Sequence, residues 1–391
     1  MPDNKHTKIP DIKQLIDQLL KIPSISCTSP EIDQGNIHII NLLADWFESL
    51  GFHCVIQALE HDENKANLIA TLGHGNNGLV LAGHTDTVPL DEALWQVDPF
   101  KATEKNDRFY GLGSCDMKSF FAIIIEALKS IDLKKINQPL IILATADEET
   151  SMSGAKAIAK HANSLGINNA RFAVIGEPTD MQPVRMHKGM MMEAIQLVGQ
   201  AGHSSDPALG NNALEAMHKV ISELLNWRDE LQSKYTNPLF EVPVPTMNLG
   251  HIHGGDNPNR ICGSCELQID IRPLPGMKLS DLRSEMQRRL NRVLQETGIQ
   301  LKTIPLTDGF EAMDTDRHSE IVQLAEKMTN TESQVVAFGT EAPYYNGIGL
   351  ETIVMGPGNI KQAHQPDEYI EMKSLMPATD IIRKLIFHYC L

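Results

Sequence analysis

The sequence is poor in cysteine and has no long apolar run. Six cysteines are spread over 391 residues, at positions 27, 54, 115, 262, 265 and 390, so a disulfide-dense secreted fold is excluded and reduced thiols are expected. The polar start of the chain, MPDNKHTKIPDIKQ, lacks a secretory apolar segment, and no run approaches the roughly 18 apolar residues of a spanning helix. We therefore expect a cytoplasmic protein that has no membrane partner.

Positive charge is also in short supply. The 34 Lys and Arg residues face 50 Asp and Glu residues, which gives a net charge of −16. Nucleic acids and anionic membrane surfaces both require basic patches, so the balance argues against either as a partner. An anionic small molecule can still bind where metal ions make the local site positive. The length favours two domains, and a hydrophobic content of 42% suffices for their cores.

Strand-like and helix-like patterns alternate through the first ~185 residues. Apolar runs at 78–82, 140–146 and 172–175 predict buried strands, and helical patterns lie between them at 118–129 and 154–165. Such alternation is typical of an α/β sheet with helices on both faces. We expect a three-layer domain built on a mixed sheet.

The pattern changes in the middle of the chain. The expected order there is strand, helix, two strands, helix and strand, at 190–198, 213–231, 246–253, 261–272, 280–297 and 300–305. This is the order of a split β-α-β sandwich, which makes the segment a ferredoxin-like α+β domain. The prediction is a catalytic, metal-binding domain formed by 1–185 and 304–391, with a dimerisation or lid domain inserted at 186–303.

Acidic and histidine-bearing motifs follow several of the predicted strands. They are His84-Thr85-Asp86, Cys115-Asp116-Met117, Asp147-Glu148-Glu149, Gly176-Glu177-Pro178 and Ala363-His364-Gln365. In an open α/β sheet, ligands gather at the carboxyl ends of the strands. Two imidazoles with a surplus of carboxylates can hold a pair of Zn²⁺-like ions and leave one carboxylate as a base. The motifs together therefore predict a two-metal hydrolase.

The spacing within the motifs suggests separate roles. Asp86, two residues after His84, is well placed to accept the second ring N–H of that histidine. Glu148 and Glu149 are adjacent on an extended segment and point to opposite sides, which suits one base and one metal ligand. Three consecutive acids at a buried strand end are costly unless they are compensated, and metal ions would compensate them. A carboxylate such as Asp116 can bridge two ions.

Each motif taken alone also has a purely structural explanation. Asp116 could cap a helix, and residues 147–149 could form a solvated acidic loop. A rival structural zinc site could use His251 and His253 with Cys262 and Cys265. Residues three apart on a strand face opposite sides, however, so packed strand cysteines are the simpler interpretation. Cys115 as a nucleophile lacks an evident His–Asp pair.

At these residues the chain resembles the zinc-dependent aminoacylase and carboxypeptidase superfamily with co-catalytic metals. The resemblance covers nearly the whole chain. It is carried by GHTDTVP (83–89), GLGSCDMK (111–118), ADEETS (146–151), GEPT (176–179), AGHSS (201–205), DIRPLPG (270–276), GTEA (339–342) and AHQPDE (363–368). One departure is Ser119, where relatives usually have Gly after the DMK triplet.

The resemblance implies a ligand set. One ion would be bound by His84, Asp116 and Glu177, and a second by Asp116, Glu149 and His364. The implied ions are two Zn²⁺, with Co²⁺ as an alternative, because ligand types alone do not separate these metals.

The resemblance also implies roles beyond the metals. Glu148 would be the general acid and base, and Asp86 would orient His84. The inserted domain would form a homodimer in which a histidine matching His203 reaches the other subunit's active site. Asn259 and Arg272 match positions that bind a substrate carboxylate, and Thr340 in the GTEA motif is a further candidate substrate-binding residue.

The implied activity is hydrolysis of the amide bond of a small N-acyl amino acid. The expected substrate is N²-acetyl-L-ornithine, cleaved to acetate and L-ornithine in arginine biosynthesis. A succinyl-diaminopimelate substrate or a short peptide is the enzymatic alternative, and a metal-binding, dimeric scaffold without turnover is the non-enzymatic one. Glu148 and His203 argue against the scaffold, because neither is needed merely to hold metal.

Overall fold

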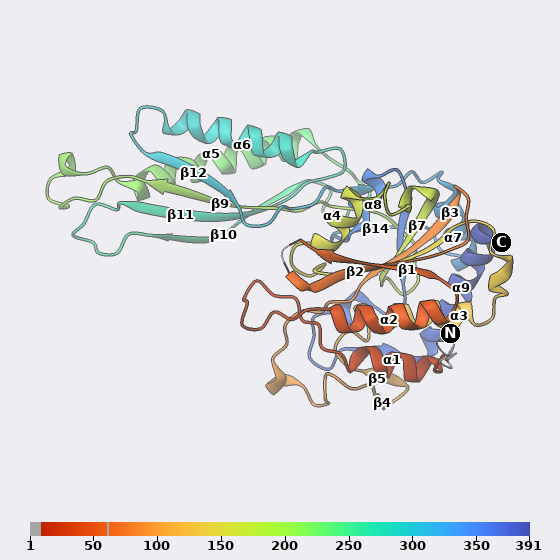
Figure 1. Cartoon of the computed structure of the whole chain (residues 1–391). Helices are drawn as coiled ribbons and strands as arrows, with labels where there is room; N and C mark the ends of the chain where they lie inside the picture. The colour runs from red at the N-terminus through yellow and green to blue at the C-terminus, as the bar shows by residue number, and fades with distance from the viewer. Residues whose placement is uncertain (1–8, 61) are drawn as a thin grey trace. The chain divides into compact units, whose positions relative to one another are not determined.

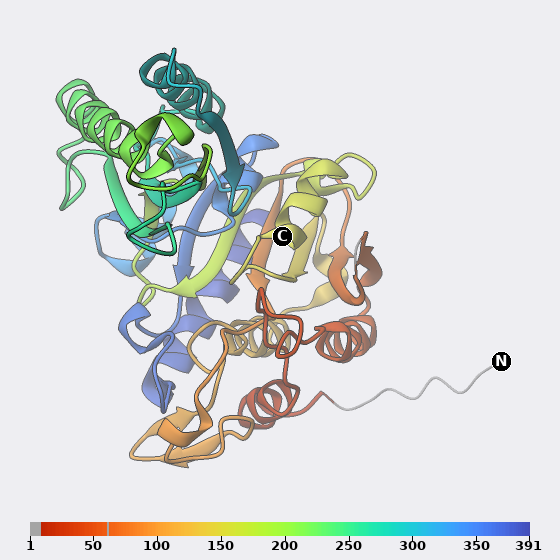
Figure 2. The same ribbon diagram turned by 90° about the vertical axis from the view of Figure 1, so that its left-hand side faces the viewer.

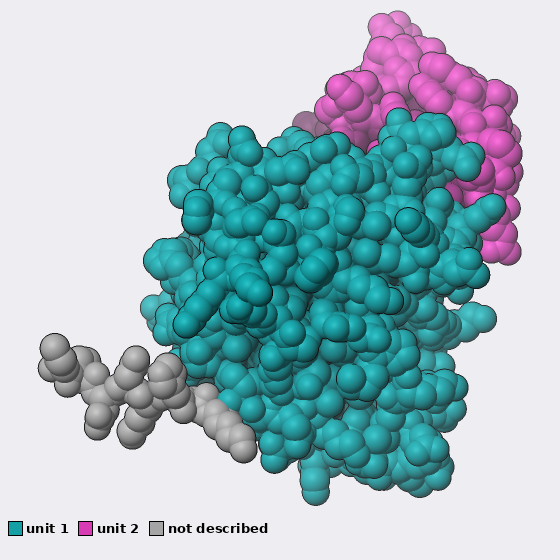
Figure 3. Space-filling model, turned by 90° about the vertical axis from the view of Figure 1, so that its right-hand side faces the viewer, with its two compact units in different colours: residues 1–185, 315–334, 340–391 teal, residues 186–314, 335–339 magenta. Residues whose placement is uncertain are grey.

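The computed structural model describes residues 9–60 and 62–391, which fall into two compact units (Figure 3). Unit 1 contains the chain up to residue 185 together with 315–334 and 340–391, and unit 2 contains 186–314 and 335–339. Unit 2 extends beyond the expected end at 303. The reason is that the chain after residue 305 stays bonded to unit 2: the Leu306 N–H donates to the Met192 carbonyl, and Phe310 bridges to Met190.

Unit 1 is built on a mixed sheet, as expected. The strand order is β1-β2-β6-β3-β7-β15-β8-β13, and β14 pairs with β8; β13, the end of β8 and most of β14 are residues counted with unit 2. The central strands β6, β3, β7 and β15 run parallel, whereas the pairings β1–β2, β2–β6, β15–β8 and β8–β13 are antiparallel. The bounds are β1 His53–Leu59, β2 Asp62–Leu72, β3 Gly78–His84, β6 Leu140–Thr145, β7 Ala170–Pro178, β8 Val184–His187, β13 Met313–Asp314, β14 Gln334–Val336 and β15 Glu351–Gly356.

Helices cover both faces of this sheet and complete three layers. Helices α1, α2 and α3 lie on one side, and α4 and α8 on the other (Figure 1). Strands β3 and β6 are apolar and buried along their whole length, as expected of parallel strands covered on both faces. The bounds are α1 Ile12–Leu20, α2 Ile37–Ser49, α3 Ser119–Leu128, α4 Ser153–Lys160, α7 Glu320–Thr329, α8 Ala342–Gly347 and α9 Met372–Cys390.

Short elements complete unit 1. A small antiparallel sheet joins β4 (Thr103–Lys105), β5 (Arg108–Tyr110) and β16 (Tyr369–Glu371). Short 3₁₀ turns occur at Glu92–Leu94, Leu133–Lys135, Ile167–Asn169 and Ile360–Gln362. Ser119, the departure from the resembled motif, begins α3 with its side chain buried. Within the described ranges, none of the helices has the length and apolar character needed to cross a bilayer.

Unit 2 is an antiparallel sheet with order β10-β11-β9-β12. Helices α5 and α6 pack side by side on one face of it (Figures 1 and 2). Its core joins apolar side chains of the sheet and of both helices, such as Ile195, Leu267, Met217 and Leu290. The order of elements is consistent with the expected ferredoxin-like domain. The bounds are β9 Met191–Val198, a 3₁₀ turn Pro207–Leu209, α5 Ala213–Lys234, β10 Thr246–Gly254, β11 Ser264–Arg272, α6 Leu279–Leu294 and β12 Gln300–Pro305.

Candidate metal centre

The parallel strands of unit 1 end at one edge of the sheet and carry the predicted motifs there. His84 is the last residue of β3, and Glu177 lies one residue before the end of β7. Residues 147–149 follow the end of β6, which pairs with β3 in register His84↔Thr145. Since β3 lies between β6 and β7, the three motifs emerge next to one another.

Asp116 lies between the two predicted imidazole ligands. Its Oδ1 is 3.2 Å from Nε2 of His84, and its Oδ2 is 3.5 Å from Nε2 of His364. The Oε1 atom of Glu177 is 3.7 Å from the same His84 nitrogen, and Oε1 of Glu149 is 3.1 Å from the His364 nitrogen. The contacts therefore divide into a His84–Glu177 side and a His364–Glu149 side, which share the two oxygens of one carboxylate.

Potential ligand atoms are concentrated at this place. Among the residues that the structure describes, His, Cys, Asp and Glu atoms lie within 4.8 Å of one another in two groups of three. One group is His84, Glu148 and Glu177, and the other is His84, Asp116 and Glu149. Glu148 thus belongs to the same cluster as the predicted ligands.

The charges of the cluster fit cations. Burial raises the pKa of Glu148 well above its usual range, and the neighbouring Glu149 adds to the effect. The pKa of Glu177 is also raised well above its usual range, by burial and then by the Asp116 charge. Burial disfavours a charged His84 ring, yet the hydrogen bond that the ring donates to Asp116 and the nearby carboxylates raise the pKa of His84 well above 6.5. Buried carboxylates that repel each other this strongly need a positive partner, and mixed N and O donors suit Zn²⁺.

Asp86 is placed differently from the sequence expectation. The Nδ1 atom of His84 is 3.0 Å from the backbone carbonyl oxygen of Asp86 but 3.7 Å from its carboxylate. The carboxylate instead accepts the backbone N–H groups of Glu148, at 3.2 Å, and Glu149, at 3.1 Å. Asp86 therefore orients His84 through its main chain, because its side chain is occupied by the acidic turn.

The sequence analysis assigned no role to Glu368, which supports the Asp116 loop. Its side chain is buried, and Oε1 accepts the N–H groups of Cys115 at 2.7 Å and Asp116 at 3.0 Å. Its Oε2 accepts the N–H of Gly113 at 3.1 Å. Backbone donors leave no pattern in the sequence, so the only available signal was an acid four residues after His364.

The remaining candidate site residues are the four that the sequence analysis expected to bind the substrate or the oxyanion. His203, Asn259 and Arg272 belong to unit 2. The His203 ring is exposed and its Nδ1 lies 2.7 Å from the Ser205 hydroxyl oxygen, while Nε of Arg272 donates to Asp270 at 3.0 Å. Thr340, in unit 1, is fully buried, and its hydroxyl accepts the Ala342 N–H.

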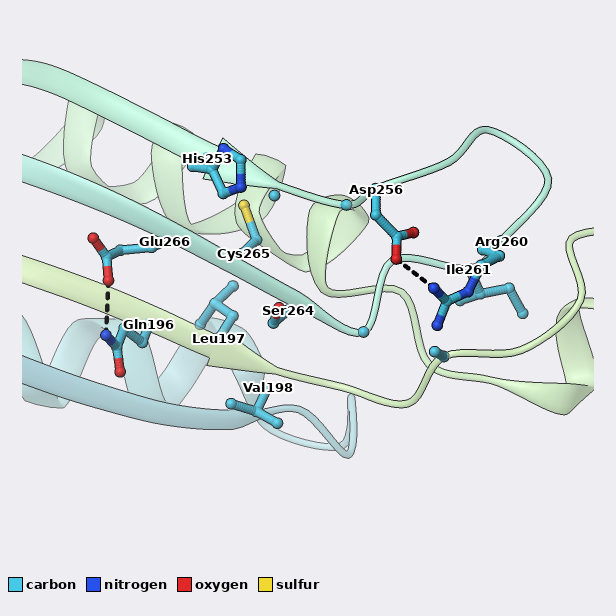
Figure 4. A pocket seen from close by; sticks show the side chains of 14 residues that line it. Gln196, Leu197, Val198, His253, Asp256, Arg260, Ile261, Ser264, Cys265 and Glu266 are labelled. Atoms are coloured by element: carbon cyan, nitrogen blue, oxygen red, sulfur yellow. Dashed lines mark hydrogen bonds and ion pairs between the residues drawn. The ribbon is translucent and has the colours of Figure 1, made fainter.

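The rival zinc site does not assemble. His253 and Cys265 are neighbours on β10 and β11 beside a pocket of unit 2 (Figure 4). The pocket also holds an ion pair between Arg260 and Asp256. In the described part of the chain, no group of three potential ligands includes Cys262 or Cys265. The two cysteines instead belong to the apolar core of unit 2.

Known proteins match this chain along most of its length. Residues 80–388 match the family model described as Peptidase family M20/M25/M40. The chain is 48% identical to the acetylornithine deacetylase of Pectobacterium carotovorum subsp. carotovorum over 382 residues, which covers 98% of each protein. It is also 48% identical to the acetylornithine deacetylase of Proteus mirabilis over 384 residues, again 98% of each. Among solved structures, the M20 family metallo-carboxypeptidase Sso-CP2 of Sulfolobus solfataricus superposes with a TM-score of 0.74 at 19% identity, covering 97% of this chain and 99% of that one.

Proposed function

The chain belongs to peptidase family M20/M25/M40, and we propose that it removes the acetyl group from N²-acetyl-L-ornithine to give L-ornithine and acetate. The substrate is supported by relatives with that named activity, which match along 98% of the chain. The reaction type is supported by one observation above all: the two oxygens of Asp116 face two different imidazoles. This is the arrangement that a pair of ions sharing one carboxylate requires.

We infer two Zn²⁺ as the resident ions, with Co²⁺ able to replace them. His84, Asp116 and Glu177 would hold one ion, and Asp116, Glu149 and His364 the other. When bound, the ions polarise the acetyl carbonyl and make water acidic enough to deprotonate near neutral pH.

Glu148 is the residue that moves the proton. It lies in the ligand cluster without being needed for either ion, and burial makes its carboxylate more basic than usual by raising its pKa. A base of this kind takes a proton from the attacking water and later gives it to the departing amine of ornithine. Asp86 holds the backbone of this turn while it does so.

Unit 2 would supply the remaining groups. We infer a homodimer formed through this unit, in which His203 donates a hydrogen bond to the developing oxyanion in the other subunit's site. Arg272 and Asn259 would bind the α-carboxylate, because a guanidinium matches a carboxylate with two parallel hydrogen bonds. Thr340 would support the same substrate site from unit 1. The free thiols of all six cysteines are consistent with a cytoplasmic enzyme of arginine biosynthesis.

Acetate release tests the proposal directly. The purified protein is stripped with a chelator, restored with Zn²⁺ or Co²⁺, and assayed on acetyl-ornithine, succinyl-diaminopimelate and a dipeptide. We expect no turnover after stripping and the highest kcat/KM on acetyl-ornithine after restoration. A preference for another substrate would overturn the assignment, and a metal-loaded protein that cleaves none of them would indicate a binding scaffold.

A further inference from the structure

A buried lysine lies behind the acidic turn of the metal centre. Lys65 is in β2 and is only 8% exposed. Its Nζ is 2.7 Å from Oδ1 of Asp147 and 2.7 Å from Oδ2 of Asp33. A buried ammonium group is retained only where such partners offset the loss of hydration. The lysine therefore ties the first residue of the 147–149 turn to the loop before α2.

Every acceptor of Asp147 is already used within the protein. Besides Lys65, the hydroxyl of Ser26 donates to Oδ1 at 3.0 Å and the hydroxyl of Ser153 donates to Oδ2 at 2.9 Å. The backbone carbonyl accepts the N–H groups of Ser151 at 3.0 Å and Met152 at 2.6 Å. Asp147 is therefore engaged away from the metal cluster.

This arrangement revises the charge balance that the sequence suggested. Metal ions were expected to compensate all three consecutive acids. Lys65 instead compensates Asp147, so that only Glu148 and Glu149 face the ligand cluster. Lys65 therefore neutralises the acid that has a structural role, Asp147, and leaves Glu148 and Glu149 for metal binding and proton transfer.

The turn itself has a backbone conformation that needs support. Asp147 has a φ of 59°, in the left-handed region that residues other than glycine seldom adopt. Such a conformation persists only where the surroundings fix it. Lys65, Ser26 and Ser153 hold Asp147 through its side chain, and the Asp86 carboxylate holds the next two N–H groups. The peptide that carries Glu148 and Glu149 is therefore held at several points.

We propose that Lys65 is a positioning residue for the reaction: through Asp147 it fixes the turn that aims Glu148 at the reacting water and Glu149 at its ion. The inference rests on the proposed function, because it assumes that Glu148 is the base. Displacement of a catalytic group by about 1 Å can lower a rate about a hundredfold. Lys65 should accordingly affect turnover much more than substrate binding.

Three variants separate positioning from folding. Lys65→Met removes the charge and leaves Asp147 buried without its cation. Lys65→Arg keeps the charge but moves the donor atoms. The double variant Lys65→Met with Asp147→Asn removes the charge at 147 and leaves only the Asp33 carboxylate without its cation, so it should recover part of the thermal stability that Lys65→Met loses. Lys160→Met is the matched control, because Lys160 forms an ion pair of 2.8 Å with Glu60 in which both side chains are over 60% exposed.

The assay measures kcat, KM, bound metal and melting temperature for each holoenzyme. We expect Lys65→Met and the double variant to lose about ten- to a hundredfold in kcat, with KM within about twofold and two ions retained. Lys65→Arg should fall between wild type and Lys65→Met, and Lys160→Met should match wild type.

Either of two results would overturn the proposal. One is a normal kcat in the double variant or in Lys65→Arg. The other is a loss of kcat that merely follows the loss of bound metal, which would make Lys65 a support of the ion site alone. Wild-type holoenzyme is assayed first, because its failure to cleave acetyl-ornithine would overturn the proposed function instead.

Discussion

At the residue scale, two adjacent acids of one turn have different surroundings. Glu149 is 3.1 Å from the imidazole of His364, whereas Glu148 belongs to the group around His84 and Glu177. The two residues lie in a turn rather than on the extended segment that the sequence suggested, so the conformation of the turn, and not strand alternation, directs them to different partners. A base and a ligand can therefore be distinguished by isosteric substitutions.

We expect Glu148→Gln to retain two ions and lose most turnover. The amide has the same shape but cannot take a proton, and general acid–base catalysis is worth about 10²- to 10⁴-fold. Metal analysis and acetate release on the same sample check this. Glu149→Gln is the paired variant and should lose metal as well as activity. Near-normal turnover in Glu148→Gln would remove Glu148 from the mechanism.

A second residue-scale prediction concerns the fully buried His187 of unit 2. Burial lowers the pKa of His187 to about 4, although a hydrogen bond to the Lys188 carbonyl opposes the shift. In the unfolded chain this ring takes up a proton below about 6.5, and in the folded chain only below about 4. The unfolded state therefore binds more protons across this window, so stability falls as the pH drops from 6.5 towards 4.

The magnitude follows from the same linkage. Between pH 6.5 and 4.5 the His187 contribution amounts to about 2 kcal/mol of lost stability. We expect His187→Phe, which keeps a ring beside Phe310, to lose that much less stability than wild type over this interval. Urea unfolding of the chelated proteins at both pH values measures the difference. Equal losses in the two proteins would show that His187 titrates normally.

At the element scale, the sequence predicted strands that are apolar along their whole length and missed strands that are accessible or begin with polar residues. The runs that became β3, β6 and β7 are apolar throughout and could be placed without the structure. Strands β1 and β2 were missed, because β1 is mostly accessible and β2 begins with the polar residues 62–65. Helix α4 ends at Lys160 rather than near 165, because the chain turns there into the loop before β7.

The residues of the metal centre, too, could be predicted from the sequence only in part. Its presumed ligands could be found because they follow strands that are easy to predict. Lys65 and Glu368 could not, because one acts from the missed strand β2 and the other binds backbone N–H groups. Contacts that a distant side chain makes with a turn depend on tertiary structure and leave no pattern in the sequence.

Glu368 yields a prediction about how two segments are coupled. It follows His364 by four residues and holds the N–H groups of the loop that carries Asp116, so it links the two segments that face each other across the shared ligand. In Glu368→Gln one acceptor becomes an NH₂ group that cannot accept from these donors. We expect metal affinity to fall about 10- to 100-fold, as for other residues that orient ligands.

Competition with a chromogenic chelator measures this affinity. Glu371→Gln is the control, because Glu371 pairs with Arg108 at 2.9 Å in the small sheet and makes no contact with the Asp116 loop among the interactions described. It should bind metal like wild type. Unchanged affinity in Glu368→Gln would mean that the loop keeps its conformation without this carboxylate.

At the scale of the whole molecule, the two units have separate cores and unequal shares of the metal centre. One apolar cluster lies in unit 1 and another in unit 2. All five presumed ligands, His84, Asp116, Glu149, Glu177 and His364, belong to unit 1. Metal binding should therefore stabilise one unit directly and leave the other unchanged.

Calorimetry of stripped and metal-loaded protein tests this separation. At a free metal concentration about 1,000 times the Kd, each ion contributes about 4 kcal/mol, so two ions contribute about 8 kcal/mol. For a unit of this size each kcal/mol raises Tm by about 2–4 °C, so the unit 1 transition should rise by about 16–32 °C while that of unit 2 stays in place. Asp116→Ala should abolish the rise, because it removes the carboxylate that the two ions would share. If both transitions shift together, the units unfold as one cooperative body, and if neither shifts, the buried carboxylates are balanced without metal.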